Sequence, residues 1–182
     1  MKLVLASASP RRSEMLRLLG IDFEVIPAGV AELTAGDPPV IVVENAIRKA
    51  RAIERRGALI LGVDTDVVSD GRLLGKPGDD GDATARLRAL SGRTHEVLSG
   101  IALRRDGEER SELVRTEVTF RSLEAAEIEA YVASGEWRDR AGGYAIQGLG
   151  SALVERVEGD LSNVIGLPIP ALGRMIADLQ DA

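Results

Sequence analysis

The chain has 182 residues, a formal net charge of −6 and no cysteine, and this length suits one domain with a sizeable core. Without thiols, a disulfide framework, a cysteine nucleophile and a Cys-ligated zinc site are excluded, and a single histidine excludes a His-rich metal site. The acidic balance and the 3% of aromatic residues argue against nucleic-acid binding, and apolar runs such as 3–6 and 58–63 are far shorter than the ~18 residues of a membrane span.

The first part of the chain alternates between strands and helices. The predicted elements are a strand at 2–6, a helix from Ser9 and Pro10 to Gly20, a strand at 22–27, a helix at 39–56 and a strand at 59–63. Ser9 is a good N-cap, and Pro10 is favoured at the first helical position. The unbroken apolar run at 59–63 is typical of a strand buried on both faces. This order predicts a layered α/β domain.

The second part adds antiparallel strands. The predicted elements are strands at 65–69 and 72–74, a helix at 82–90, strands at 94–104 and 111–120, a helix at 124–134, a strand at 152–157 and a helix at 170–179. Asp70-Gly71 is a type I′ hairpin signal, and Asp106-Gly107 marks a second turn between strands. The sequence therefore predicts an α/β fold in three layers, with a mixed β-sheet between flanking helices.

The segment from Ser7 to Arg12 combines features of an anion site. Ser7 and Ser9 follow a strand, and Arg11 and Arg12 stand in the first turn of a helix, where free N–H groups and the dipole favour an anion. Cations there cost on the order of a few tenths of a kcal/mol each, a penalty that an anionic ligand would reverse. The alternative is a surface helix whose arginines point into water.

Lysine is rare in this chain. Of 23 basic residues, 20 are arginine and three are lysine, namely Lys2, Lys49 and Lys76. An ammonium is a compact point charge, whereas a guanidinium is a planar fork. From composition alone, chance or codon supply would explain the excess of arginine over lysine as well as a functional role would. Together with the anion site, however, Lys49 and Lys76 become candidate phosphate contacts, which makes an oligophosphate ligand the better interpretation.

Asp64 stands at the predicted carboxyl end of the buried strand 59–63, where ligands bind in open α/β sheets. A carboxylate there can hold Mg²⁺ or accept a proton from an attacking water, and an ordinary turn aspartate is the alternative. By strand alternation Asp66 shares the face of Asp64, but it lies inside the next predicted strand and could simply be exposed. Glu32, in a loop that contains glycine, would by itself be a surface glutamate.

Three other positions carry weaker signals. His95 has no second histidine or cysteine to join it, so we interpret it as structural. Trp137 and the charged residues after it could shape a lid or cap a turn. Gln147 lies in a segment flanked by glycine, where its amide could contact a base edge through a paired donor and acceptor. The five-residue string around it is a weak signal when taken alone.

Taken together, these strings resemble the Maf-like nucleoside triphosphate pyrophosphatases. The most specific is Leu5-Ala6-Ser7-Ala8-Ser9-Pro10-Arg11-Arg12, and the resemblance covers nearly the whole chain in the expected order. It continues through Glu32, 45–46, 49–50, 62–65, 75–77, 90–92, His95, Asp139 with 141–142, 144–148 and 163–168. The resemblance implies a Maf/ITPase-like fold, a mixed sheet between helices with two lobes around a central cleft.

The resemblance also implies a reaction, the hydrolysis of a nucleoside triphosphate to the monophosphate and pyrophosphate with Mg²⁺ or Mn²⁺. Asp64 matches the proton acceptor, and Glu32 matches a carboxylate that supports metal or water, so these two are the expected metal ligands. Positions that line the polyphosphate site are matched by Ser7, Arg11, Arg12, Lys49 and Lys76, to which we add Ser9 from its place in the segment. Positions linked to substrate choice in the subgroup acting on dTTP and UTP are matched by Arg12, Thr65 and Gln147.

The chain departs from the pattern of the family at three positions. Ala31 stands where a carboxylate is often found, Arg140 replaces the usual lysine, and Leu161 replaces a common aromatic residue. These changes bear on rate and selectivity more than on the reaction class, because Asp64 and both internal lysines are retained.

Two other functions stay open at this point. A sister subgroup prefers 7-methyl-GTP and carries a different sequence around 144–148. A nucleotide-binding regulator of septum formation and cell division would act through a protein contact and would not need the acidic and basic set. We expect a cytoplasmic protein of one domain, residues 1–182, that binds a nucleoside triphosphate but neither nucleic acid nor membranes, with a homodimer as an open alternative to a monomer.

Overall fold

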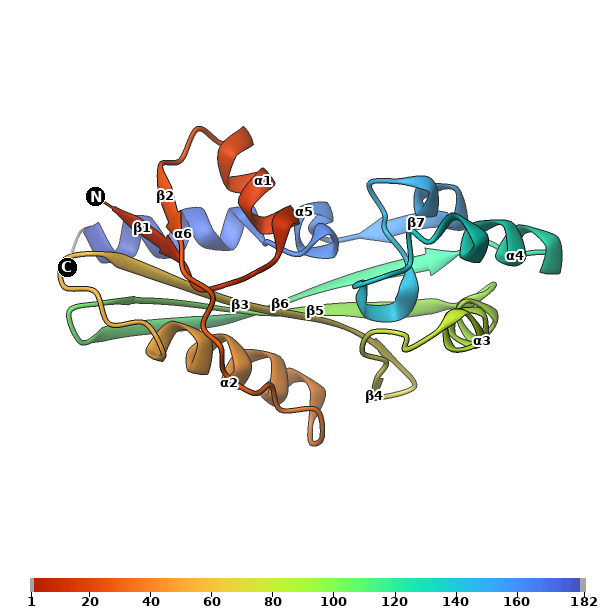
Figure 1. The fold of residues 1–182 in the computed structure, drawn as a ribbon, viewed down its shortest axis with the longest axis horizontal. Helices are drawn as coiled ribbons and strands as arrows, with labels where there is room; N and C mark the ends of the chain where they lie inside the picture. The colour runs from red at the N-terminus through yellow and green to blue at the C-terminus, as the bar shows by residue number, and fades with distance from the viewer. Residues whose placement is uncertain (1, 181–182) are drawn as a thin grey trace. The chain divides into compact units, whose positions relative to one another are not determined.

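The computed structural model describes residues 2–180 of the chain. Its strands form a sheet in the order β2–β1–β3–β5–β6–β7, with β4 paired to β3 (Figure 1). The strands are β1 (Leu3–Leu5), β2 (Phe23–Val25), β3 (Leu59–Ser69), β4 (Arg72–Leu73), β5 (Thr94–Arg105), β6 (Glu108–Phe120) and β7 (Val154–Glu158). β1 is parallel to both β2 and β3, whereas β4 is antiparallel to β3 and β7 to β6. The predicted mixed sheet is therefore confirmed.

The helices begin and end at recognisable signals. They are α1 (Pro10–Leu18), α2 (Pro38–Arg51), α3 (Asp80–Leu90), α4 (Ala125–Ser134), α5 (Leu161–Ile165) and α6 (Ile169–Gln180), with short 3₁₀ turns η1 (Ala141–Gly143) and η2 (Leu149–Leu153). Asp79 caps α3 by accepting a hydrogen bond from Asp82 N at 2.8 Å, and α4 ends at Gly135 with φ 73°, a left-handed conformation that glycine adopts without strain. None of the helices within residues 2–180 is both long and apolar enough to cross a membrane.

The contacts divide the chain into two compact units. The first consists of Met1–Thr65, Ser99–Val114 and Gly166–Ala182, and the second of Asp66–Leu98 and Arg115–Ile165. That they form the single predicted domain, residues 1–182, stays a prediction.

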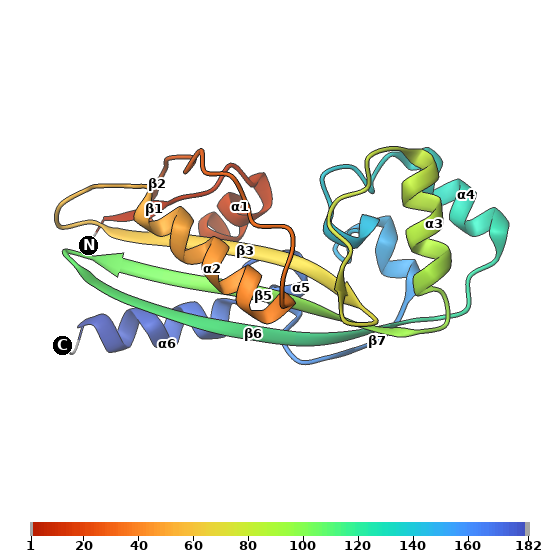
Figure 2. The same ribbon diagram turned by 90° about the horizontal axis from the view of Figure 1, so that it is seen from below.

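In the first unit, helices lie on both sides of the sheet. α2 lies on one side, and α1 and α6 lie on the other (Figure 1); Figure 2 shows α2 lying across β3 and β5. Two glycines permit this close approach, because a Cβ atom on Gly62 would overlap the carbonyl oxygen of Ala46, and one on Gly100 would overlap that of Val42. The face of α2 that carries Asn45 and Lys49 is thereby held directly against the sheet.

In the second unit, α3 and α4 contact each other and enclose an apolar cluster with the strands. The large members of this cluster are Leu87, Phe120, Tyr131, Trp137 and Tyr144. The buried Trp137 donates from Nε1 to the carbonyl of Val132 at 3.2 Å. It is a core residue, so the suggested lid is wrong for its side chain.

Most predicted elements are present, with two instructive differences. The helix predicted to end at residue 56 ends at Arg51. Ile53, two residues later, belongs to a buried apolar cluster that also includes residues of α2. The strand predicted over 59–63 continues to Ser69, so Asp64 lies inside β3 and not at its carboxyl end. The sequence predicted a break at Asp64 before a second strand at 65–69, but Asn45 and Lys49 satisfy the Asp64 carboxylate and the strand runs on through it. The short α5, η1 and η2 were not predicted.

The two hairpin signals are correct. Asp70 and Gly71 both have positive φ, 50° and 71°, as a type I′ turn requires. Asp106 and Gly107 also have positive φ, 50° and 100°, at the turn between β5 and β6.

Candidate active site

A buried lysine of the first unit lies between two carboxylates. Lys49 Nζ is 2.7 Å from Asp64 Oδ1 and 2.5 Å from Glu32 Oε1. Lys49 comes from α2, Asp64 from β3 and Glu32 from the loop between β2 and α2. Lys49 and Asp64 are buried, whereas the side chain of Glu32 is 52% exposed. The ion cluster is therefore open to solvent on the side of Glu32.

Asn45 fixes both Asp64 and the loop that carries Glu32. Its Nδ2 donates to Asp64 Oδ2 at 2.9 Å and to the carbonyl of Leu33 at 3.0 Å, while its Oδ1 accepts from Leu33 N at 2.7 Å. Asn45 and Lys49 stand four residues apart in α2 and so share one face. Each oxygen of Asp64 thus has a donor from α2 and keeps acceptor capacity. No role was predicted for Asn45 from the sequence, although its spacing from Lys49 was a usable signal.

Arg12 is buried in a polar cluster close to these carboxylates. Its Nε donates to the carbonyl of Gly166 at 2.8 Å, Nη1 donates to Ser7 Oγ at 2.9 Å, and Nη2 donates to Thr65 Oγ1 at 3.2 Å. Burial lowers the pKa of Arg12, and the negative charges of Asp64 and Glu32 oppose that shift. A guanidinium has five N–H donors, so three bonds to the protein leave two for a ligand.

Thr65 belongs to the same cluster. Its Oγ1 lies 2.7 Å from Ser99 Oγ and donates to the carbonyl of Gly166 at 3.4 Å. The predicted specificity residues Arg12 and Thr65 therefore contact each other directly. A change in either residue will disturb the other.

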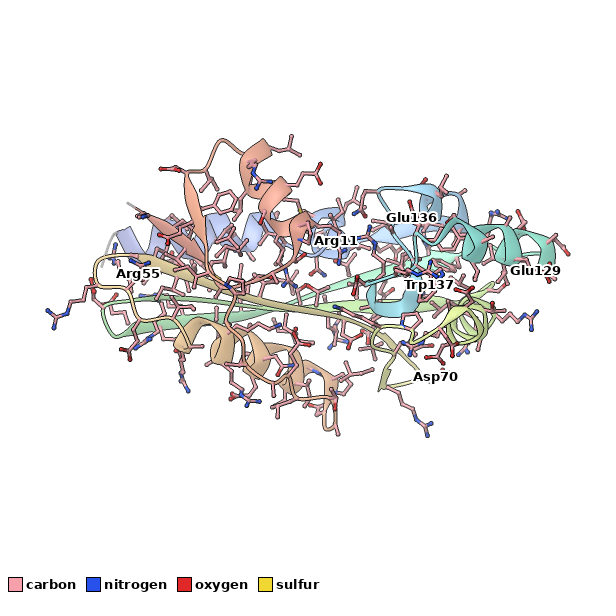
Figure 3. All side chains as sticks on the ribbon, viewed as in Figure 1. Arg11, Arg55, Asp70, Glu129, Glu136 and Trp137 are labelled. Carbon is pink, nitrogen blue, oxygen red and sulfur yellow. The ribbon has the colours of Figure 1, made fainter. Side chains whose placement is uncertain are left out.

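The start of α1 carries the other candidates of the first unit. Ser9 precedes α1 at the N-cap position, but its side chain makes no cap hydrogen bond. Instead its N–H donates to Ser7 Oγ at 3.2 Å, so Ser7 links Ser9 to Arg12. Arg11, labelled in Figure 3, is half-buried in the first turn of α1. The structure thus places Ser7, Arg12 and Thr65 in one set of contacts and Glu32, Lys49 and Asp64 in another, and the two sets meet at Asp64 and Thr65, which are neighbours in β3.

Lys76 and Gln147 belong to the second unit. Lys76 is exposed, and its Nζ lies 3.9 Å from Asp139 Oδ1. Gln147 is also exposed. That these two side chains meet the same substrate as Lys49 and Asp64 stays a prediction.

Asp66 and His95, which were considered as candidates from the sequence, both interact with other residues of the second unit. Asp66 is half-buried and not simply exposed, because its Oδ1 accepts from Val67 N at 2.7 Å and from Gly75 N at 3.0 Å. His95 is buried, its Nε2 lies 2.8 Å from Tyr144 Oη, and its ring meets Phe120 edge-on. Burial lowers the pKa of His95 to about 4. This environment suits the structural role that we expected for His95.

The carboxylates suit a hard divalent cation that takes further ligands from a substrate. Mg²⁺ is commonly held by one or two carboxylates together with phosphate oxygens and water. Glu32 and Asp64 contact the same ammonium group, so their oxygens are close together. Within residues 2–180 no group of three or more His, Cys, Asp or Glu side chains is arranged to hold a metal alone. The residues therefore fit a cation that binds together with a phosphate.

The sequence was also compared with known proteins. A family model described as "Maf-like protein" matches residues 2–179. This chain belongs to the Maf-like family. A Maf-like relative from Syntrophus aciditrophicus, named dTTP/UTP pyrophosphatase, is 45% identical over 98% of this chain and 90% of its own. Relatives with the same name from Anaeromyxobacter dehalogenans and Deinococcus radiodurans are 51% and 44% identical, over 92% and 96% of this chain and 89% and 91% of theirs.

Among solved structures, a HAM1 protein from Coxiella burnetii matches 66% of this Maf-like chain and 73% of its own chain, with a TM-score of 0.46 and 26% identity. The family predicted from the sequence is confirmed by the match over residues 2–179.

Proposed function

We propose that the chain hydrolyses dTTP and UTP, and related pyrimidine or modified nucleoside triphosphates, to the monophosphate and pyrophosphate. The observation that carries this proposal is the position of Lys49, buried between Asp64 and Glu32 next to the Arg12 cluster. Relatives at 44–51% identity bear the name of this activity. The site pairs cations suited to a polyphosphate with carboxylates suited to water and a divalent cation.

Charge neutralisation is the first task of these residues. The N-terminus of α1 and the two remaining donors of Arg12 favour a phosphate beside Ser7. Lys49 already contacts two carboxylates, and an incoming phosphate would replace its contact with the exposed Glu32. The buried contact with Asp64 would be kept, because Asn45 holds that carboxylate from the other side.

Proton transfer is the second task. A divalent cation held by Glu32 and Asp64 would supply Lewis-acid polarisation of the α-phosphate and lower the pKa of a bound water. Asp64 accepts a proton from the attacking water while the oxygen of that water bonds to the α-phosphorus. The bond from that phosphorus to the bridging oxygen breaks, and pyrophosphate leaves with the bond electrons. Catalysis then rests on positioning and charge stabilisation.

Substrate choice is assigned to Arg12 and Thr65 in the first unit and to Gln147 in the second. The carboxamide of Gln147 offers a donor and an acceptor, which complement the neighbouring carbonyl and N–H of uracil and thymine. Lys76 is assigned to the polyphosphate. Cytoplasmic location, a homodimer and the lack of nucleic-acid and membrane partners also stay predictions.

A nucleotide panel tests the proposal. The protein is incubated with each common NTP and dNTP and with 7-methyl-GTP, with Mg²⁺ or Mn²⁺, and pyrophosphate is separated from orthophosphate. We expect pyrophosphate, with UTP and dTTP as the best substrates. Orthophosphate as the only product would overturn the proposal. Preferential turnover of 7-methyl-GTP would support the sister activity, and tight binding without turnover would support a regulator.

A further inference from the structure

Hydrogen bonds hold both ends of the segment 145–150 of the second unit, which carries Gln147. At one end Ala145 N donates to Tyr131 Oη at 3.0 Å. At the other, Leu149 N donates to Glu136 Oε1 and Gly150 N to Glu136 Oε2, both at 2.9 Å. Tyr131 Oη in turn donates to Glu136 Oε2 at 3.0 Å. One phenol and one carboxylate therefore hold the whole segment.

The segment itself is a closed turn. Gly148 N donates to the carbonyl of Ala145 at 3.1 Å, so Ile146 and Gln147 are its two central residues. Ile146 packs against the apolar cluster of the second unit, whereas Gln147 is exposed. This turn directs one side chain inward and presents the next one to solvent.

The contact between Glu136 and this segment leaves no room for a side chain at Gly148. A Cβ atom on Gly148 would overlap the Glu136 carboxylate, and one on Gly150 would lie 2.6 Å from the carbonyl oxygen of Ala145. Glu136 is labelled beside Trp137 in Figure 3, and the buried Trp137 fixes the chain next to it. Burial raises the pKa of Tyr131, which keeps its hydroxyl protonated for donation to Glu136.

We propose that Glu136 is a positioning residue for substrate choice, because it fixes the turn that presents Gln147 to the pyrimidine base. This inference rests on the proposed function, in which Gln147 contacts the base. Glu136 acts through the backbone N–H groups of Leu149 and Gly150 and does not contact the substrate itself. Loosening the turn lets the Gln147 amide sample several directions, so its hydrogen bonds to the base are held less often.

The Glu136→Gln variant tests this. Both oxygens of Glu136 accept from N–H or O–H donors, so in either orientation the new NH₂ group faces a donor. We expect the KM for UTP and dTTP to rise about tenfold, as loss of a charge-assisted hydrogen bond allows, while kcat changes less than about twofold. The preference for UTP over CTP should fall, and amide hydrogen exchange at Leu149 and Gly150 should accelerate.

Glu127→Gln is the matched control. Glu127 is also a carboxylate of the second unit that accepts a backbone N–H, from Glu124 at 2.9 Å, and it pairs with Arg121. Its loss should leave the KM values and the exchange at 149–150 unchanged. Should Glu136→Gln fail to fold, Tyr131→Phe carries the same test, because it keeps the ring and removes the hydroxyl that joins Ala145 to Glu136.

The outcomes separate the two proposals. A wild-type protein that releases no pyrophosphate from UTP contradicts the proposed function. An active wild type together with a folded Glu136→Gln or Tyr131→Phe variant of unchanged KM and base preference contradicts the role of Glu136. Equal losses for UTP and CTP, confined to kcat, would also contradict it, because a general structural defect would cause them.

Discussion

Asp64 lies in the middle of β3 with a donor on each carboxylate oxygen, Lys49 on one and Asn45 on the other. These contacts fix its orientation while leaving acceptor capacity for a water proton. The rarity of lysine pointed to Lys49 from the sequence, and the structure places that residue at the centre of the ion cluster. Lys2 received no role, and it pairs with Glu24 at 2.9 Å with its side chain mostly exposed.

Asp64→Asn tests the proton acceptor. Asparagine keeps the shape of the side chain but takes no proton, so we expect kcat for pyrophosphate release from UTP to fall by about 10²–10⁴-fold. Steady-state assays measure the rate, and circular dichroism with thermal unfolding checks that the fold is kept. Full activity in a folded Asp64→Asn protein would exclude Asp64 as the base.

His95 makes the stability of the chain depend on pH. Its pKa is lowered by burial from 6.5 to about 4, so between these values the unfolded state binds more protons than the folded state. The contribution is fully present above pH 6.5 and is lost as the pH falls to about 4, by up to about 3 kcal/mol. Urea unfolding of wild type and His95→Gln over this range measures it. The variant should show the shallower dependence, and parallel curves would contradict the prediction.

At the scale of elements, α2 is the part that assembles the site. Its close contact with β3 and β5 depends on Gly62 and Gly100, and its inner face supplies Asn45 and Lys49 to Asp64. α2 also holds the loop of Glu32 through the bonds between Asn45 and Leu33. A small displacement of α2 would therefore disturb several site contacts at once.

Gly62→Ala tests this dependence. The added methyl group meets the backbone of Ala46 and Ala50, so we expect the free energy of unfolding to fall by about 1–3 kcal/mol, together with a loss of kcat. Gly173→Ala in α6 is the control, because nothing lies within 4 Å of its Cβ position and alanine there should stabilise the helix by about 0.5–1 kcal/mol. Chemical unfolding and activity assays compare them. Wild-type stability in Gly62→Ala would show that α2 can move without cost.

The elements differ in how far the sequence predicts them. α1 and the turn at Asp70-Gly71 follow from local signals, a proline at the first helical position and a residue pair that tolerates positive φ. β3 was predicted as two strands, 59–63 and 65–69, with a break at Asp64, and the contacts of Asp64 and Thr65 were not predicted. Their partners, among them Lys49 and Ser99, are distant in sequence, and no local pattern reveals them. The same holds for Glu136, whose contacts reach 13 and 14 residues along the chain.

At the scale of the whole molecule, the net charge of −6 is distributed unevenly. Acidic residues exceed basic ones mainly in the second unit, while the first unit, which holds the ion cluster, is nearly balanced. An anionic substrate is therefore compatible with an acidic protein, since Lys49 and Arg12 lie where the phosphates are expected. The composition excluded several classes of protein. The candidate site could be predicted only from the positions of these few cations in the sequence.

Hydrolysis of UTP in ¹⁸O-labelled water tests the central claim most directly. If Asp64 activates water for attack on the α-phosphorus, the labelled oxygen appears in UMP and the pyrophosphate stays unlabelled. Mass spectrometry of the two products after a single turnover distinguishes the cases. Label in the pyrophosphate, with none in UMP, would place the attack on the β-phosphorus and contradict the account.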